Sequence, residues 1–458
     1  MGFLVASAIA VVEFVQLRAA NQRIQELEAG SGDGDDGGLF GELGDLFEDL
    51  VPEGGAGLST LDCVGGLGLG LEPGRDTDRS IPGIAAEVER IRELRFEEVP
   101  EPEFLSGEET SRRVRELFLE EYTPEIADVE QRILSSLGAI PFDTDLRQLR
   151  ADTLGGQVAG YYEPETGELV VRRTGGEIST SDRVTLAHEL DHALTDQVLD
   201  IPLPDDIELG EEDRNLAALA LVEGDATVVM QRYSSGLGLE EQLEALDPAA
   251  IAEAEAGLAG LPPYLREELL FPYRQGLEFV CDLYGDGGWA AVDEAYAAPP
   301  ASTAQILFPE RYHNGETPVD PRDPSPPGKG WKEAAHLELG AANLLWLFQA
   351  PGGDVGRSLD DPRTGAGAWA GGELRLWTRG DATALGVGLV ERPGEDVLCS
   401  AMSHWYAAAF PDARASGSAA GRGLVLDGGR QDAVLTCSGD EVRLGIAPDP
   451  SPARAMAA

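Results

Sequence analysis

Basic side chains are scarce in this chain. Its 458 residues include 34 Lys plus Arg against 83 Asp plus Glu, a formal net charge of −49, and only two of the bases are lysines. A surface this acidic repels nucleic acid and anionic lipid headgroups, so the sequence predicts no nucleic-acid partner. Two explanations of the acidity stay open: a preference for basic substrates, and plain solvation of the surface.

Several other signatures are missing as well. The four cysteines show no C-x-x-C spacing, which argues against a structural zinc knot. There is no internal repeat, no phosphate-binding glycine loop and no nucleophile elbow, so solenoids, P-loop enzymes and serine hydrolases of that type are disfavoured. Histidine is also rare, with five in the whole chain, and two of the five share one motif.

That motif is His188-Glu189-Leu190-Asp191-His192, an H-E-x-x-H pattern. It lies in TSDRVTLAHELDHALTDQVL, which predicts a single amphipathic helix. The apolar stripe of this helix lies on a different side from the two histidines. Helical spacing puts His188 and His192 on one face, one turn apart, where both imidazoles can reach the same Zn²⁺. Glu189 is adjacent to the first ligand and can take a proton from a metal-activated water. The motif therefore predicts a zinc site with a general base.

The segment just before this helix supports the motif. The sequence GYYEPETGELVVRR alternates around a turn at residues 164–167 and predicts a β-hairpin. A strand followed by an H-E-x-x-H helix is the order found in zinc peptidases, where an edge strand holds extended substrate by β-augmentation.

Two histidines leave a catalytic zinc site incomplete, because such sites usually have three protein ligands and a water. Glu223 is the preferred third ligand: LAALALVEGDATVVM around it is apolar on nearly every side and predicts a buried helix, where an unpaired carboxylate is costly. Asp225 lies about 200° away round the same helix, so both cannot face one ion. Asp225 is instead a candidate to orient a ligand histidine, or to bind backbone elsewhere. Asp196, one turn beyond His192, is a weaker rival as a ligand.

A histidine pair on one helix and a glutamate on a second resemble the gluzincin arrangement of thermolysin-like peptidases. More closely, LAHELDHALTDQ, ALVEGDAT and PPASTAQILFPERY resemble an uncharacterised family of bacterial metallopeptidases, often actinobacterial and often membrane-anchored. The resemblance runs from about residue 81 into the C-terminal region and is strongest over residues 155–235. It implies a zincin-like fold, Glu189 as general base, and zinc ligands at His188, His192 and Glu223.

Two positions depart from these patterns. The thermolysin-like pattern has an Asp four residues after the ligand Glu, where this chain has Thr227. The family often has His-Pro in the S-T-x-Q-I-L segment, where this chain has Phe308-Pro309, which removes one transition-state donor. Other donors for the oxyanion are therefore considered, the role a Tyr or His commonly takes in zinc peptidases: Tyr273, Arg274, Tyr312 and His313.

The N-terminus combines an apolar run with an acidic stretch. Residues 2–15 are apolar apart from Glu13, but the run is shorter than the roughly 20 residues that span a bilayer, and no basic residue precedes it. We expect a membrane anchor over residues 1–17, completed by codons upstream of Met1; a short soluble helix packed on the body is the alternative. Residues 18–80, rich in Gly, Asp and Glu, are expected to form a poorly ordered tether.

The rest of the chain predicts three further parts. Helical periodicity marks an N-terminal helical unit, and after the catalytic segment PRDPSPPGKG predicts a linker. Beyond it, a helix over AAHLELGAANLLWLF, another over VLCSAMSHWYAAAF and several strand-like runs predict a small α+β domain. The expected boundaries are 81–150 for the helical unit, 151–320 for the metallopeptidase domain and 331–446 for the C-terminal domain.

Four cysteines allow three disulfide connectivities. Cys399 and Cys437 share the C-terminal unit and could pair if the chain is exported, with buried free thiols as the alternative. Cys63 and Cys281 carry no such local indication.

These observations lead to one prediction of fold and function. We expect an α+β protein with a mostly helical, zincin-like catalytic domain, a β-hairpin or small sheet before the active-site helix, and a C-terminal α+β domain. The expected activity is zinc-dependent hydrolysis of peptide bonds in a peptide or protein substrate, outside the cytoplasm and anchored at the membrane. The alternatives are a non-catalytic, zinc-stabilised envelope binding protein and, less favoured, hydrolysis of a non-peptide amide.

Overall fold

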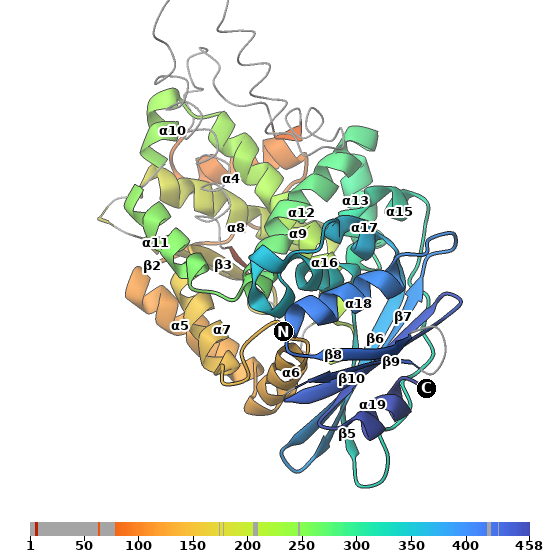
Figure 1. Cartoon of the computed structure of the whole chain (residues 1–458). Helices are drawn as coiled ribbons and strands as arrows, with labels where there is room; N and C mark the ends of the chain where they lie inside the picture. The colour runs from red at the N-terminus through yellow and green to blue at the C-terminus, as the bar shows by residue number, and fades with distance from the viewer. Residues whose placement is uncertain are drawn as a thin grey trace, which may run out of the picture.

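The computed structural model describes residues 5–7, 63–64, 78–173, 175–176, 178–204, 209–245, 248–418, 423–428 and 430–458. Helices dominate the chain as far as residue 313, and a large antiparallel sheet dominates the remainder (Figure 1). A helical core, a small sheet before it and a C-terminal α+β unit confirm the predicted fold class. Most of the expected anchor and tether, residues 1–17 and 18–80, lie outside the described residues.

The N-terminal helical unit contains the helices that the periodicity predicts. Side chains cap their first turns: Ser80 accepts a hydrogen bond from the Gly83 amide, and Ser106 with Glu109 forms a capping box. The elements of this unit are α4 (Ile81–Arg92), β2 (Glu103–Ser106), α5 (Gly107–Glu121), α6 (Pro124–Ser136) and α7 (Leu146–Gln157).

A small sheet precedes the motif helix, as expected. Its hairpin consists of β3 (Gly160–Glu163) and β4 (Glu168–Arg173), and β2 adds to β4 in parallel. On its other side β3 pairs antiparallel with the short β1 (Val5–Ser7), so the order is β1-β3-β4-β2. These three residues are the part of the apolar N-terminal run that the structure describes.

The motif helix α8 (Thr180–Leu199) begins at a capping box formed by Ser179 and Asp182. It packs on α9 (Glu212–Ser235), which carries Glu223. Both helices are buried along most of their length, and their low amphipathicity follows from neighbours on all sides.

Helix α9 crosses α12 (Pro263–Gly287) at two glycines. A Cβ added to Gly276 would lie 2.0 Å from the carbonyl oxygen of Ala220, and one added to Gly224 would lie 2.3 Å from the carbonyl carbon of Gly276. Glycine at both positions therefore lets the two backbones touch, directly beside Glu223. The remaining helices of this region are α10 (Leu239–Ala245), α11 (Pro248–Ala259), α13 (Trp289–Ala297), α14 (Thr303–Leu307) and α15 (Pro309–His313).

The C-terminal unit is built on a seven-stranded antiparallel sheet of order β5-β6-β7-β11-β10-β9-β8. One face of the sheet belongs to the same hydrophobic cluster as the helical core, with α16 and α18 between the two (Figure 1). The opposite face carries α19. The bounds are β5 (Lys332–Glu338), α16 (Ala341–Gln349), α17 (Pro362–Gly367), β6 (Trp369–Arg379), β7 (Ala382–Glu391), α18 (Leu398–Ala409), β8 (Arg414–Ser418), β9 (Gly423–Gly428), β10 (Gln431–Ser438), β11 (Glu441–Ala447) and α19 (Pro450–Met456).

One expectation about this unit is wrong. The segment AAHLELGAANLLWLF is not a single helix, because its first residues belong to β5 and pair with β6. Gly340 separates the strand from α16, which takes the second half of the segment.

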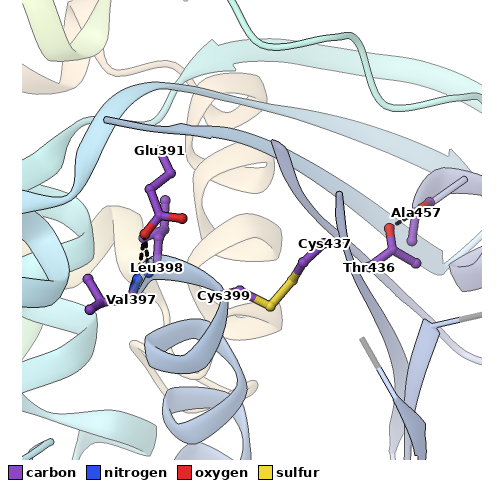
Figure 2. The surroundings of a disulfide bond; sticks show 7 residues. All are labelled: Glu391, Val397, Leu398, Cys399, Thr436, Cys437 and Ala457. Carbon is purple, nitrogen blue, oxygen red and sulfur yellow. Dashed lines mark hydrogen bonds between the residues drawn. A yellow bond between two sulfur atoms is a disulfide. The ribbon is translucent and has the colours of Figure 1, made fainter. Parts of the chain in front are cut away.

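The predicted pairing of Cys399 with Cys437 is present, with 6.1 Å between the Cα atoms. The bond joins the first turn of α18 to β10, and the Glu391 carboxylate accepts hydrogen bonds from the Val397 and Leu398 amides at the same helix end (Figure 2). Together they fix α18 on the sheet.

A second disulfide, Cys63–Cys281, was not foreseen. It fastens the acidic N-terminal stretch at one point to α12, across 218 residues of sequence. Both sulfurs are buried, and all four cysteines are thereby paired. Two disulfides point to an extracytoplasmic location, since such bonds persist in oxidising compartments. Among the helices described, none is long and apolar enough for a membrane span.

Replacing Gly276 by Ala should drive α9 and α12 apart. The added methyl group meets backbone, which cannot rotate away, so we expect a loss of about 2 kcal/mol or more in the free energy of unfolding. Gly285→Ala on the same helix is the matched control, because a Cβ there meets nothing within 4 Å and alanine favours helix. Equal denaturation midpoints for the two variants would contradict the close crossing.

Candidate metal centre

Three side chains from two helices converge in the core. His188 and His192 come from α8 and Glu223 from α9, and their ligand atoms all lie within 4.8 Å of one another. The Nε2 atoms of the histidines are 3.0 Å apart, and Glu223 Oε2 lies 3.2 Å from the first and 3.6 Å from the second. No other group of three such residues meets this condition in the described part of the chain.

The geometry fits a zinc ion. Ligands at about 2.1 Å from Zn²⁺ in a tetrahedral arrangement are separated from one another by roughly 3.4 Å. The three separations in the protein bracket this value. Two imidazole nitrogens and one carboxylate oxygen are also a typical donor set of catalytic zinc, which leaves the fourth position for water or substrate.

The surroundings hold these ligands in the protonation states that a metal requires. Burial lowers the pKa of His188 to about 4, so the imidazole is neutral. Burial alone would raise the pKa of Glu223, but hydrogen bonds from the two histidines outweigh it and lower the pKa to about 2. A buried carboxylate held ionised between two imidazoles is a strong attractor for a cation.

Glu189 is fully buried beside the triad and faces the small sheet. A Cβ added to Gly160 of β3 would lie 3.0 Å from Glu189 Oε1, so β3 passes directly alongside this carboxylate. Further along, the Tyr162 hydroxyl of β3 donates a hydrogen bond of 2.7 Å to Asp196. Strand β3 thus follows the face of α8 that carries the general-base candidate.

The rival carboxylates are engaged elsewhere. Asp196 accepts the hydrogen bond from Tyr162 and is not part of the triad. Asp225 accepts two hydrogen bonds from Arg92 and one from Tyr296. It therefore does not join the triad, and its hydrogen-bond partners among the described residues are Arg92 and Tyr296 rather than a histidine or a backbone group; Glu223 is the carboxylate that lies beside the two histidines.

The four candidate oxyanion donors each have contacts of their own. Tyr273 belongs to a separate small hydrophobic cluster, and Arg274 pairs with Glu267 at 3.6 Å. The Tyr312 hydroxyl donates to the carbonyl of Ala298, and His313 pairs with Asp282. The donor role of these four residues stays a prediction.

The two departures from the resembled patterns have different local settings. Thr227 is buried, and its hydroxyl has no hydrogen-bond partner among the described residues. Phe308 lies between two arginines, with the guanidinium of Arg311 4.6 Å and that of Arg363 4.8 Å from its ring centre. Where the resembled family often has a histidine followed by proline, this chain therefore has a phenylalanine that makes cation–π contacts with two arginines.

Sequence reasoning missed Gly160 and Arg92. A glycine inside a strand is a known sign of close approach by another group, and Gly160 in GYYE carries that sign. Arg92 has no such signal, because its partners lie far along the chain.

Comparison of the chain with protein-family models, with curated proteins and with solved structures found no match. The metal centre therefore stands on the geometry of its own residues.

We expect purified protein to hold about one zinc ion per chain, measured by elemental analysis. His188→Ala or Glu223→Ala should weaken zinc binding by roughly 100-fold or more, since even outer partners of ligands are worth 10- to 100-fold. Asp196→Ala should retain the metal, because that carboxylate pairs with Tyr162. Loss of zinc in Asp196→Ala together with retention in Glu223→Ala would show that the wrong carboxylate has been assigned.

Proposed function

We propose that this protein is a zinc-dependent peptidase. The observation that carries the proposal is the convergence of His188, His192 and Glu223 beside a buried Glu189 that lies against β3. Three protein ligands leave one position open, and a site with a carboxylate base next to it is suited to hydrolysis.

The chemistry divides between metal and protein. When bound, zinc would polarise the scissile carbonyl and lower the pKa of water in the site. Glu189 accepts the proton of the attacking water and then delivers it to the leaving amine, so one carboxylate serves as base and acid in turn. Burial keeps this carboxylate away from bulk solvent until substrate arrives.

The substrate would bind as an extended chain along β3. In the antiparallel register that β1 already uses, Ser7 lies opposite Gly160 and Val5 opposite Tyr162. An extended peptide that took the place of β1 would pass close to Glu189, since a Cβ added to Gly160 would lie 3.0 Å from its Oε1. Main-chain pairing tolerates many side chains, and the acidity of the chain favours basic peptides over acidic ones.

A non-catalytic binding protein that keeps zinc for stability is the second candidate. The complete burial of all three ligands favours it, because structural zinc sites are closed. The presence of Glu189 beside the ligands favours the peptidase, since a structural site needs no base.

In this proposal the protein acts outside the cytoplasm and is anchored at a membrane through residues 1–17, with residues 5–7 exchanging their pairing with β3 for the lipid. The two disulfides support the extracytoplasmic location. The apolar N-terminal run and the acidic, glycine-rich stretch after it support the anchor.

Glu189→Gln should abolish peptidase activity while zinc and fold remain. The amide nearly matches the carboxylate in shape but cannot accept the proton, so kcat should fall by about 10²-fold or more. Cleavage is measured on a peptide library derived from a whole proteome, with zinc content and thermal unfolding as controls. A wild-type protein that binds zinc tightly and cleaves nothing in that library would favour the binding-protein candidate.

Fractionation of cells that express the native gene should place the chain in the membrane fraction, with its body open to protease added from outside. The physical reason is the apolar run at residues 2–15, which would partition into lipid, followed by a charged stretch that stays in water. Protein found only in the soluble cytoplasmic fraction, and shielded from protease, would contradict the anchor.

A further inference from the structure

Behind the triad, one arginine occupies a fully buried position among carboxylates. Arg92, the last residue of α4, donates from Nε to both oxygens of Asp225 at 3.0 Å. Its Nη2 lies 2.7 Å from Asp293 of α13, and its guanidinium stacks 4.5 Å from the Trp289 ring. The Tyr296 hydroxyl donates to the same Asp225 carboxylate at 2.9 Å.

The motif helix α8 also carries a carboxylate, Asp191, that interacts electrostatically with this guanidinium. Asp191 is completely buried and interacts electrostatically with Arg92 and Asp225. Its two oxygens have no hydrogen-bond partner in the described part of the chain. An isolated buried carboxylate is strongly disfavoured, and Arg92 is the positive charge that acts on Asp191.

Both carboxylates are close to metal ligands in sequence but point elsewhere. Asp191 precedes His192 by one residue, about 100° round α8, and Asp225 follows Glu223 by two residues, about 200° round α9. Helix α4 packs against both of these helices. Arg92 therefore fastens α9 to a helix that also packs on α8, and the spacing of α8 and α9 sets the distance from the histidine pair to Glu223.

We propose that Arg92 is the positioning residue of the metal centre: through Asp225 it ties α9 to α4, which packs on α8 behind the triad, and so fixes the three ligands at metal-binding distance. This role rests on the proposed function only in requiring that the triad binds zinc. An arginine suits it because a planar guanidinium can engage several carboxylates at once, which the single ammonium of lysine does not.

Arg150 provides a matched control. Its guanidinium pairs with Glu130 and Glu268 and so also joins helices, α7 with α6 and α12. It contacts neither α8 nor α9 through these ion pairs. Losing either arginine costs folding stability, whereas loss of metal affinity in the folded protein is expected for Arg92 alone.

The test compares Arg92→Lys with Arg150→Lys in the full chain. The zinc dissociation constant is measured by competition with a chromophoric chelator, at a temperature where circular dichroism shows every variant folded. Cobalt absorption spectra report the ligand geometry independently of activity. Arg92→Lys should weaken zinc binding by about tenfold or more and alter the cobalt spectrum, while Arg150→Lys changes the constant by no more than about twofold.

Each result has a defined meaning. Equal, small effects of the two substitutions on a wild type that binds zinc would overturn the role of Arg92 and leave the peptidase proposal standing. A wild type that binds no zinc would overturn both. If Arg92→Lys fails to fold, Asp225→Asn serves in its place, since it keeps the shape of the carboxylate and removes the charge that Arg92 engages.

Discussion

Ionisable groups buried on two sides of the α8–α9 pair are the constraint on which this structure depends. On one side lie two imidazoles and the Glu223 carboxylate, and on the other lies Arg92 among carboxylates. Burying unpaired charge costs far more than packing returns, so each set needs partners for its charges. The Arg92 guanidinium supplies the positive charge on one side, and the group on the other side could hold a metal ion. The two requirements act on the same pair of helices, which links the N-terminal helix α4 to the metal centre.

Other contacts of the core hold the helices α8 and α9 in the buried interior. The glycine crossing of α9 and α12 brings backbones into contact directly beside Glu223, and the Cys63–Cys281 disulfide lies about one turn further along α12. Arg232 packs at the same end of α12: its guanidinium stacks on the Tyr284 ring and donates a hydrogen bond to the carbonyl oxygen of Cys63. The acidic N-terminal stretch is thus fastened at Cys63 to α12, the helix that packs against the ligand helix α9.

Local sequence was sufficient for the parts of the site that lie within one or two helices. The histidine spacing follows from the helical repeat, and Glu223 could be chosen because a carboxylate in a wholly apolar helix needs a partner. Arg92 could not be found this way, since 133 residues separate it from Asp225 and nothing near it in sequence marks the contact. The Cys63–Cys281 pair was hidden for the same reason. Residues 334–338 were predicted as helix because their strand partner, β6, lies some 40 residues further on and local periodicity carries no sign of it.

The contact between Gly160 and Glu189 bears on what the buried site is for. Position 160 has no room for a side chain, because a Cβ there would lie 2.9 Å from the carbonyl oxygen of Val170 and 3.0 Å from both Glu189 Oε1 and the methyl group of Thr185. The strand beside Glu189 therefore has no side chain at the nearest point, and β1 of this chain pairs with it antiparallel on the side away from β4. Bare backbone next to a carboxylate base allows a second backbone to approach both at once. In the structure that second backbone is β1, and in the proposed peptidase an extended substrate would take its place.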